Sequence, residues 1–306
     1  PMATTKQGIE ITNEQTGALN MLFQFEHMDL DSVPGHANGK WALKPLDLRD
    51  LKATLSRWQT ELDGRGWNSL YLSNHDQPRP VSRFGDDGPY RIESAKMLGT
   101  FLHFMQGTPY VYQGEELGMT NVRFRTIDEY QDIESLNMYR VAVGERGEDP
   151  QSVMNSIYAK GRDNARTPVQ WDDSPNAGFT TGKPWLQVNP NHTTINAKQA
   201  LADPNSVFHH YRKLIALRKA NPVMVYGHYA LILPEHAEIY AYTRVLGDDR
   251  LLVICNFSRN TPVFSLPSTL ACTSCELLIG NYSGDGRGDL RALTLRPYEA
   301  RAYRLR

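Results

Sequence analysis

The stretch Leu70-Tyr71-Leu72-Ser73-Asn74-His75-Asp76 (LYLSNHD) is the part of the chain that decides the fold. Three apolar residues are followed at once by polar ones, which is typical of a short buried strand. In parallel α/β barrels, the active-site residues lie directly after such strands. Two similar runs flank this stretch, at Leu19 to Phe25 (LNMLFQF) and at Tyr110-Val111-Tyr112. We therefore expect three strands in this part of the chain.

Helical patterns fill the two intervals between these strands. Apolar residues recur at spacings of three and four at Leu48, Leu51, Leu55, Trp58 and Leu62, which predicts an amphipathic helix. Asp47 is placed to cap its start, and glycines follow its end. A second helix is predicted over 92–105. Strands that alternate with helices in this way form βαβ units, so the three strands should run parallel.

The rest of the chain changes character twice. Residues 118–204 read as a long loop region, and Asp203-Pro204 is predicted to open a helix that stops at Pro222. Beyond it, two alternating runs around 239–245 and 251–257 predict an antiparallel hairpin. We predict two domains: a part of an α/β barrel over 1–222 and a small antiparallel β-sandwich over 223–306.

Composition narrows the class of protein. The 306 residues carry a formal net charge of -1 and no basic run, which argues against nucleic acid as a partner. No segment approaches the roughly 20 apolar residues of a membrane helix. Three cysteines are too few for a disulfide scaffold, and the Cys272-x-x-Cys275 pair lacks a second pair of metal ligands. These observations predict a cytoplasmic protein with reduced thiols and no membrane partner.

Several long motifs resemble those of oligo-1,6-glucosidases and related α-glucosidases of the α-amylase superfamily, glycoside hydrolase family 13. The resemblance covers essentially the whole chain, in the order in which the family carries these motifs. The motifs are FQFEHMDLD (23–31), LSNHDQPRPVSRFG (72–85), GTPYVYQGEELGMTN (107–121), GRDNARTPVQWDDSPNAGF (161–179), NPNHTTIN (189–196) and LRPYEARAY (295–303). It implies the C-terminal part of a (β/α)8 TIM barrel, strands six to eight, followed by the β-sandwich.

The resemblance also assigns roles to particular residues. Asp76 matches the family's third catalytic carboxylate, which grips glucose hydroxyls and stabilises the transition state. His75 matches a neighbouring sugar-binding histidine. Arg162 and Arg166 are the candidates for the arginine that binds the terminal glucose, and spacing from Asp76 favours Arg162.

Two further residues have a structural alternative. Glu134 resembles a residue that contacts the leaving sugar, but it could equally be a carboxylate on a helix surface. Phe25 could line the same subsite, and a core position is at least as plausible for a phenylalanine.

The implied activity is that of a retaining, exo-acting α-glucosidase that releases terminal α-linked glucose from short oligosaccharides such as maltose, isomaltose or sucrose. Retention requires a nucleophile and an acid/base, and neither family motif occurs in this sequence. We therefore expect the chain to need an N-terminal part of the barrel, and to be inactive and prone to aggregate alone. No cofactor or metal is expected here, and the calcium site of some relatives would lie in that other part.

Three alternatives remain open at this stage. Trehalose-6-phosphate hydrolases share many of the motifs, and sucrose isomerases share the RDNARTP segment. A non-catalytic α-glucosidase-like subunit is the alternative from another class of protein, although the intact NHD and RDNAR motifs argue against a degraded site.

Overall fold

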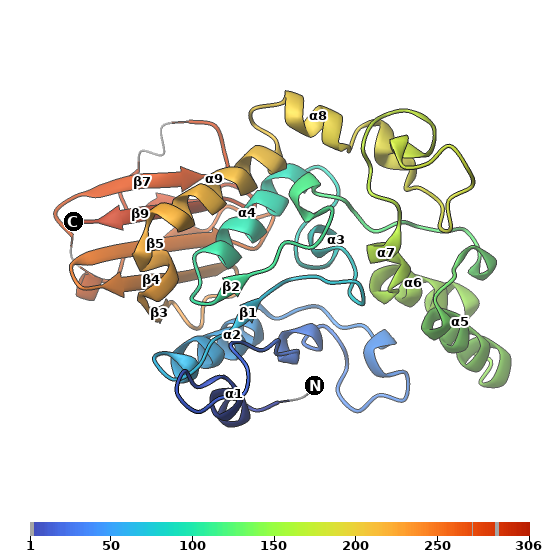
Figure 1. The fold of residues 1–306 in the computed structure, drawn as a ribbon, viewed down its shortest axis with the longest axis horizontal. Coiled ribbons are helices and arrows are strands. Elements are labelled where there is room, and N and C mark those ends of the chain that lie inside the picture. Colours follow the sequence, from blue (N-terminus) through green and yellow to red (C-terminus); the bar gives the residue numbers. More distant parts are fainter. Residues whose placement is uncertain (1–2, 271, 285–287) are drawn as a thin grey trace.

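The computed structural model describes residues 3–270, 272–284 and 288–306. Figure 1 shows a mostly helical part that contains the N-terminus and, at the opposite end of the molecule, an antiparallel sheet that contains the C-terminus. The helices are α1 (Thr5–Thr12), α2 (Leu48–Leu62), α3 (Pro80–Phe84), α4 (Arg91–His103), α5 (Ile133–Tyr139), α6 (Pro150–Lys160), α7 (Asp163–Arg166), α8 (Ala197–Ala202), α9 (Val207–Ala220) and α10 (Pro222–Tyr226).

The predicted amphipathic helix is α2, and its bounds match the apolar pattern. The Asp47 carboxylate accepts a hydrogen bond from the backbone amide of Arg49 and so caps the first turn. The five apolar residues that define the pattern are all buried. The spacing of the apolar residues was therefore sufficient to predict this helix.

The strands of the helical part run parallel, as predicted, but they are shorter than the apolar runs. β1 (Ser69–Leu70) pairs in parallel with β2 (Thr108–Pro109), and Leu22 forms a single parallel bridge to Asn68. The expectation of strands over 19–25, 70–72 and 110–112 was wrong in extent. Tyr71 and Leu72 are buried without being paired in a strand. The other two runs were expected to be buried, but Leu19, Phe23, Tyr110 and Val111 are exposed, so the apolar runs fixed neither the extent of pairing nor burial.

One helix begins later than predicted. The side chain of Ser206, and not that of Asp203, caps α9 by accepting a hydrogen bond from His209 N. The helix then starts at Val207 and ends at Ala220, and the short helix α10 starts at Pro222. The Asp203 carboxylate instead accepts from the amide of Asn205 in the turn before the helix.

The C-terminal part is an antiparallel sheet with strand order β3-β4-β5-β9-β7. Its predicted hairpin is confirmed as β4 and β5, which turn at Gly247. A separate two-stranded sheet, β6 with β8, adds further strands. The strands are β3 (His228–Ile232), β4 (Ile239–Leu246), β5 (Asp249–Asn256), β6 (Val263–Phe264), β7 (Cys275–Gly280), β8 (Leu293–Thr294) and β9 (Ala300–Leu305).

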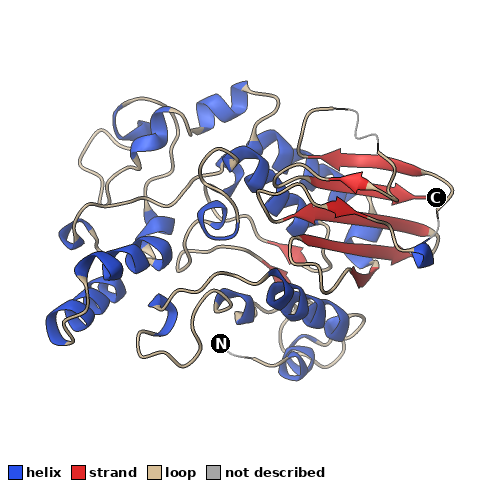
Figure 2. Cartoon of the chain, turned by 180° about the vertical axis from the view of Figure 1, so that it is seen from behind, coloured by secondary structure: helices blue, strands red, loops and turns tan. Residues whose placement is uncertain are grey.

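Both faces of the five-stranded sheet are apolar. On one face, Tyr240 and Tyr242 share a core with Phe101 of α4, and the Tyr242 hydroxyl donates to Phe101 O (2.7 Å). In Figures 1 and 2, α4 and α9 lie across this face of the sheet. On the other face, Ile239 and Ile254 belong to a second core that includes residues of β6 and β8. The sheet is thereby fixed to the helical part through its first face.

Within the described residues, no helix combines the length and the apolar character that crossing a membrane requires. All three cysteines have free thiols: Cys255 is buried and Cys275 is exposed.

Candidate active site

His75 and Asp76 lie in the loop after β1, five and six residues beyond its last residue Leu70, and belong to a cluster of charged side chains. Arg166 Nη2 donates to Asp76 Oδ1 (2.6 Å), and Arg166 Nε donates to the carbonyl oxygen of His75 (2.9 Å). Arg162 Nη1 is 3.7 Å from Asp76 Oδ1, and His75 Nε2 is 3.3 Å from Asp76 Oδ2. The Asp76 side chain is 42% exposed, so a ligand from solvent can reach it.

Arg162 donates through two of its three guanidinium nitrogens to Asp132, the residue that caps α5. Arg162 Nη2 and Nε donate to Asp132 Oδ1 at 2.5 and 3.0 Å. Burial alone would raise the pKa of Asp132, but the hydrogen bond and charge of Arg162 outweigh it and lower that pKa. The same hydrogen bond raises the pKa of Arg162. The pair therefore stays ionised and holds Arg162 beside Asp76.

Glu134 extends the cluster on the side of α5. Its Oε2 atom lies 3.2 Å from Arg162 Nε and 2.6 Å from Lys40 Nζ, and its side chain is 38% exposed. It is a carboxylate on the surface of a helix and also belongs to the charged cluster, and its contact with a leaving sugar stays a prediction. The acids Asp76, Asp132 and Glu134 thus face three cations, Lys40, Arg162 and Arg166.

Buried polar side chains fix the short helix α7, which carries Arg166. Arg79 is wholly buried and donates to the backbone oxygens of Asn164 (2.9 Å) and Ala165 (3.2 Å). The Asn164 amide donates to Tyr158 O and Gly161 O and accepts from Val122 N. A helix of four residues is not stable by itself, so these bonds place Arg166.

Two residues that follow β2, Tyr112 and Glu115, form hydrogen bonds with the segments that carry Arg166 and His75. The Tyr112 hydroxyl donates to Ala165 O (3.2 Å). Glu115 is buried and accepts a hydrogen bond from Ser73 Oγ (2.5 Å). Burial raises the pKa of Glu115 to about 8, so this carboxyl group is neutral at pH 7.

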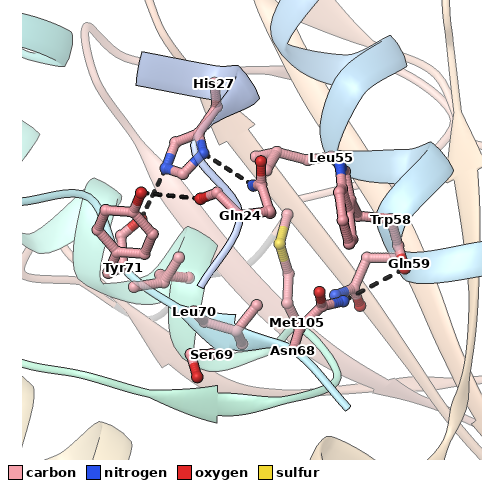
Figure 3. A pocket seen from close by; sticks show the side chains of 11 residues that line it. Gln24, His27, Leu55, Trp58, Gln59, Asn68, Ser69, Leu70, Tyr71 and Met105 are labelled. Atoms are coloured by element: carbon pink, nitrogen blue, oxygen red, sulfur yellow. Dashed lines mark hydrogen bonds between the residues drawn. The ribbon is translucent and has the colours of Figure 1, made fainter. Parts of the chain in front are cut away.

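Phe25 belongs to an aromatic network beside β1. Its ring lies edge-on to Tyr71, with 5.7 Å between ring centroids. Figure 3 shows the hydrogen bonds next to it: His27 Nδ1 accepts from Gln24 Nε2, His27 Nε2 donates to Tyr71 O, and the Tyr71 hydroxyl donates to Gln24 O. Burial lowers the pKa of His27 to about 4, so its ring is neutral. This network joins the 19–28 segment to β1.

The cavity drawn in Figure 3 lies beside this network, between α2 and the strands. Its volume is about 20 Å³, far below the roughly 300 Å³ at which ligand pockets begin, so it cannot hold a sugar. The cluster at Asp76, by contrast, is open to solvent.

Two members of the cluster, Asp132 and Lys40, were not found from the sequence. Asp132 begins the DIESLN segment, where a helix cap was the only visible signal, and Lys40 carried no signal. The preference for Arg162 over Arg166 rested on spacing, whereas Arg166 makes the direct hydrogen bond to Asp76.

No set of three or more His, Cys, Asp or Glu side chains within 3–270, 272–284 and 288–306 is arranged to hold a metal ion. The site instead offers carboxylate oxygens as acceptors beside planar guanidinium donors. This combination suits vicinal hydroxyl groups, which donate and accept at once.

Comparison with known proteins bears on both parts of the chain. Residues 2–227 match the alpha amylase catalytic domain, and residues 229–301 match the C-terminal domain of maltogenic amylase. The oligo-1,6-glucosidase of Parageobacillus thermoglucosidasius is 63% identical over 306 residues, which are 100% of this chain and 54% of the relative. The chain spans about half the length of the curated relatives that it matches.

Solved structures agree with the sequence relatives. The trehalose-6-phosphate hydrolase of Bacillus licheniformis superposes with a TM-score of 0.95 at 47% identity, over 99% of this chain and 54% of that one. Isomaltulose synthase of Klebsiella sp. LX3 gives a TM-score of 0.93 at 37% identity, over 99% and 54% of the two chains. The fold of this chain is thus that of part of a TIM barrel followed by a C-terminal antiparallel sheet, and the chain belongs to the alpha-amylase family of glycoside hydrolases.

Proposed function

We propose that this chain supplies the glucose-gripping part of a retaining, exo-acting α-glucosidase. Its substrates would be short oligosaccharides with a terminal α-linked glucose, of the maltose, isomaltose and sucrose type. The observation that carries the proposal is the contact of Asp76 with Arg166 and Arg162 after β1, at an exposed carboxylate. The 63% identity to an oligo-1,6-glucosidase supports this substrate class. The protein would act in the cytoplasm, where its thiols would stay reduced.

In this proposal Asp76 accepts hydrogen bonds from two neighbouring glucose hydroxyls. Such bonds strengthen as positive charge develops on the sugar ring, which favours the oxocarbenium-like transition state. Arg166 and Arg162 hold the carboxylate ionised and oriented, and His75, whose side chain is 72% exposed, donates to the same sugar. Glu134 and Phe25 would contact the leaving sugar.

A retaining mechanism also needs a nucleophile and an acid/base roughly 5 Å apart. We propose that a further barrel segment supplies both, and we call the chain together with that segment the assembled enzyme. No cofactor is proposed for the reaction.

Substrate hydrolysis by the assembled enzyme tests this function. We expect release of glucose from isomaltose or maltose, and Asp76→Asn should lower kcat/KM on the order of 10²–10³-fold, because the neutral amide cannot stabilise the developing charge. The matched control is Asp47→Asn, at the start of α2, which should leave kcat/KM unchanged. Activity that survives Asp76→Asn would refute the role of Asp76, and no hydrolysis of any glucoside would refute the function.

A second candidate, trehalose-6-phosphate hydrolysis, is favoured by the TM-score of 0.95 to such an enzyme. Sucrose isomerisation is the third, because of the likeness to isomaltulose synthase. Trehalose 6-phosphate and sucrose therefore join the substrate panel, with products resolved by chromatography. Preference for the phosphorylated sugar, or formation of isomaltulose, would replace the first proposal by one of these two.

A further inference from the structure

A buried ion cluster lies apart from the sugar-binding residues and touches the segments that carry them. Asp31 accepts from Arg83 through both oxygens, Nη2 to Oδ1 at 2.8 Å and Nε to Oδ2 at 2.9 Å, and it also accepts from Lys160 Nζ. The side chains of Arg83 and Lys160 are 2% and 4% exposed, and that of Asp31 is 14% exposed. Two buried cations thus share one carboxylate.

Each cation is linked to one of the two segments that carry the candidate site. Arg83 Nη1 donates to Gln77 Oε1 (2.6 Å), and Gln77 follows Asp76 in the chain. Lys160 is the last residue of α6, and only Gly161 separates it from Arg162. The carboxylate of Asp31 therefore joins the segment of Asp76 to the segment of Arg162, in addition to the direct bonds of Arg166 to His75 and Asp76.

Stability alone does not explain this arrangement well. Taking charges out of water is costly, and a buried ion pair is often no better for stability than apolar residues of the same volume. Here two cations share a single carboxylate, so one positive charge is left over. Burial also lowers the pKa of Lys160 to about 8. A fixed distance between two segments is, in contrast, what a bidentate and branched contact supplies.

We propose that Asp31 is a positioning residue that sets the distance between Asp76 and the arginines of the 161–166 segment. The proposal rests on the proposed function, because the distance matters only if both groups hold one sugar. A misplacement of about 1 Å in groups that position a substrate can cost on the order of 10²-fold in rate. We expect the same misplacement to weaken the binding of a glucose mimic.

The test compares three variants of the assembled enzyme: Asp31→Asn, Asp31→Asn/Lys160→Met and the control Glu299→Gln. Glu299 is buried and pairs with Arg296 and Arg301 in the C-terminal sheet, far along the chain from the site. The measurements are Tm and the inhibition constant of deoxynojirimycin, a glucose mimic, at a temperature where every variant is folded.

We expect both Asp31→Asn and Glu299→Gln to lower Tm. Of these two variants, only Asp31→Asn should raise the inhibition constant, on the order of tenfold. The double variant removes the unpaired lysine and should regain Tm without regaining affinity. Affinity that returns together with Tm, or that is unchanged in Asp31→Asn, would show a purely structural role and overturn the proposal. An unmodified enzyme that does not bind the mimic would instead remove the proposed function, and the proposal with it.

Discussion

Two carboxyl groups near the ends of the parallel strands have opposite surroundings. Asp76 is partly exposed and faces two guanidinium groups, so it is an acceptor ready for sugar hydroxyls. Glu115 is buried, and desolvation outweighs its hydrogen bond from Ser73 and the charge of Arg79. The result is a pKa of about 8, which keeps the Glu115 carboxyl group neutral in the support of the site at pH 7.

The raised pKa of Glu115 makes stability depend on pH. Between its ordinary value of 4.5 and about 8, the native state holds a proton that the unfolded chain releases, so the free energy of unfolding falls as pH rises. Glu115→Gln should remove this slope and stabilise the protein at pH 8 by on the order of 3 kcal/mol. Urea unfolding of both proteins at pH 5 and pH 8 measures the change in the free energy of unfolding.

The control for this prediction is Glu10→Gln, at an exposed residue of α1 that is not among the causes of the raised pKa of Glu115. That variant should keep the pH slope of the unmodified protein. An unchanged slope in Glu115→Gln would mean that Glu115 is ionised in the native state.

At the residue scale, the sequence located much of the cluster but not its full composition. His75, Asp76 and the two arginines stand in two long motifs, and the fold brings these motifs together. Asp132 and Lys40 could not be found, because their partners are distant in the chain and meet them only in the folded structure. The assigned roles in sugar binding stay predictions.

At the element scale, α7 depends on its surroundings more than any long helix does. The Asn164 side chain makes three buried hydrogen bonds, and Arg79 supplies two more to the α7 backbone. Asn164→Ala leaves buried backbone groups without partners, so we expect a loss of about 2–4 kcal/mol in the free energy of unfolding. Equilibrium denaturation measures the loss.

The matched control is Asn155→Ala, because the amide of Asn155 is exposed and bonds only to side chains of Arg123 and Gln151 among the contacts described. Its expected effect is within about 0.5 kcal/mol. Equal losses in both variants would contradict the anchoring role of Asn164.

Elements with a clear period were the ones predicted well. The five apolar positions of α2 and the alternation of β4 and β5 reflect one buried face, which the sequence records directly. The extent of β1 and β2 could not be predicted, because pairing depends on where the chain turns away into loops. The start of α9 was missed since two residues, Asp203 and Ser206, are both good caps and only tertiary packing selects one.

At the scale of the whole molecule, the parallel strands lie beside an exposed aromatic surface. Phe23 is 38% exposed and Tyr110 is 41% exposed, and their ring centroids are 4.7 Å apart. Leu19 and Val111, from the same two segments, are also exposed. An apolar surface beside a short parallel ladder favours association with another chain or segment.

We therefore expect the 306-residue chain alone to bind the dye ANS, to scatter light at micromolar concentration and to release no glucose from isomaltose. Phe23→Ser/Tyr110→Ser should lower both dye binding and scattering, because it removes the apolar contact surface while the buried core stays intact. The control Trp171→Ser/Trp185→Ser changes two aromatic side chains that are more exposed, 54% and 66%, but lie in the loop region far along the chain. If the control variant lowers scattering as much, association is not specific to the strand surface; if the chain is monomeric and hydrolyses isomaltose, it needs no further barrel segment.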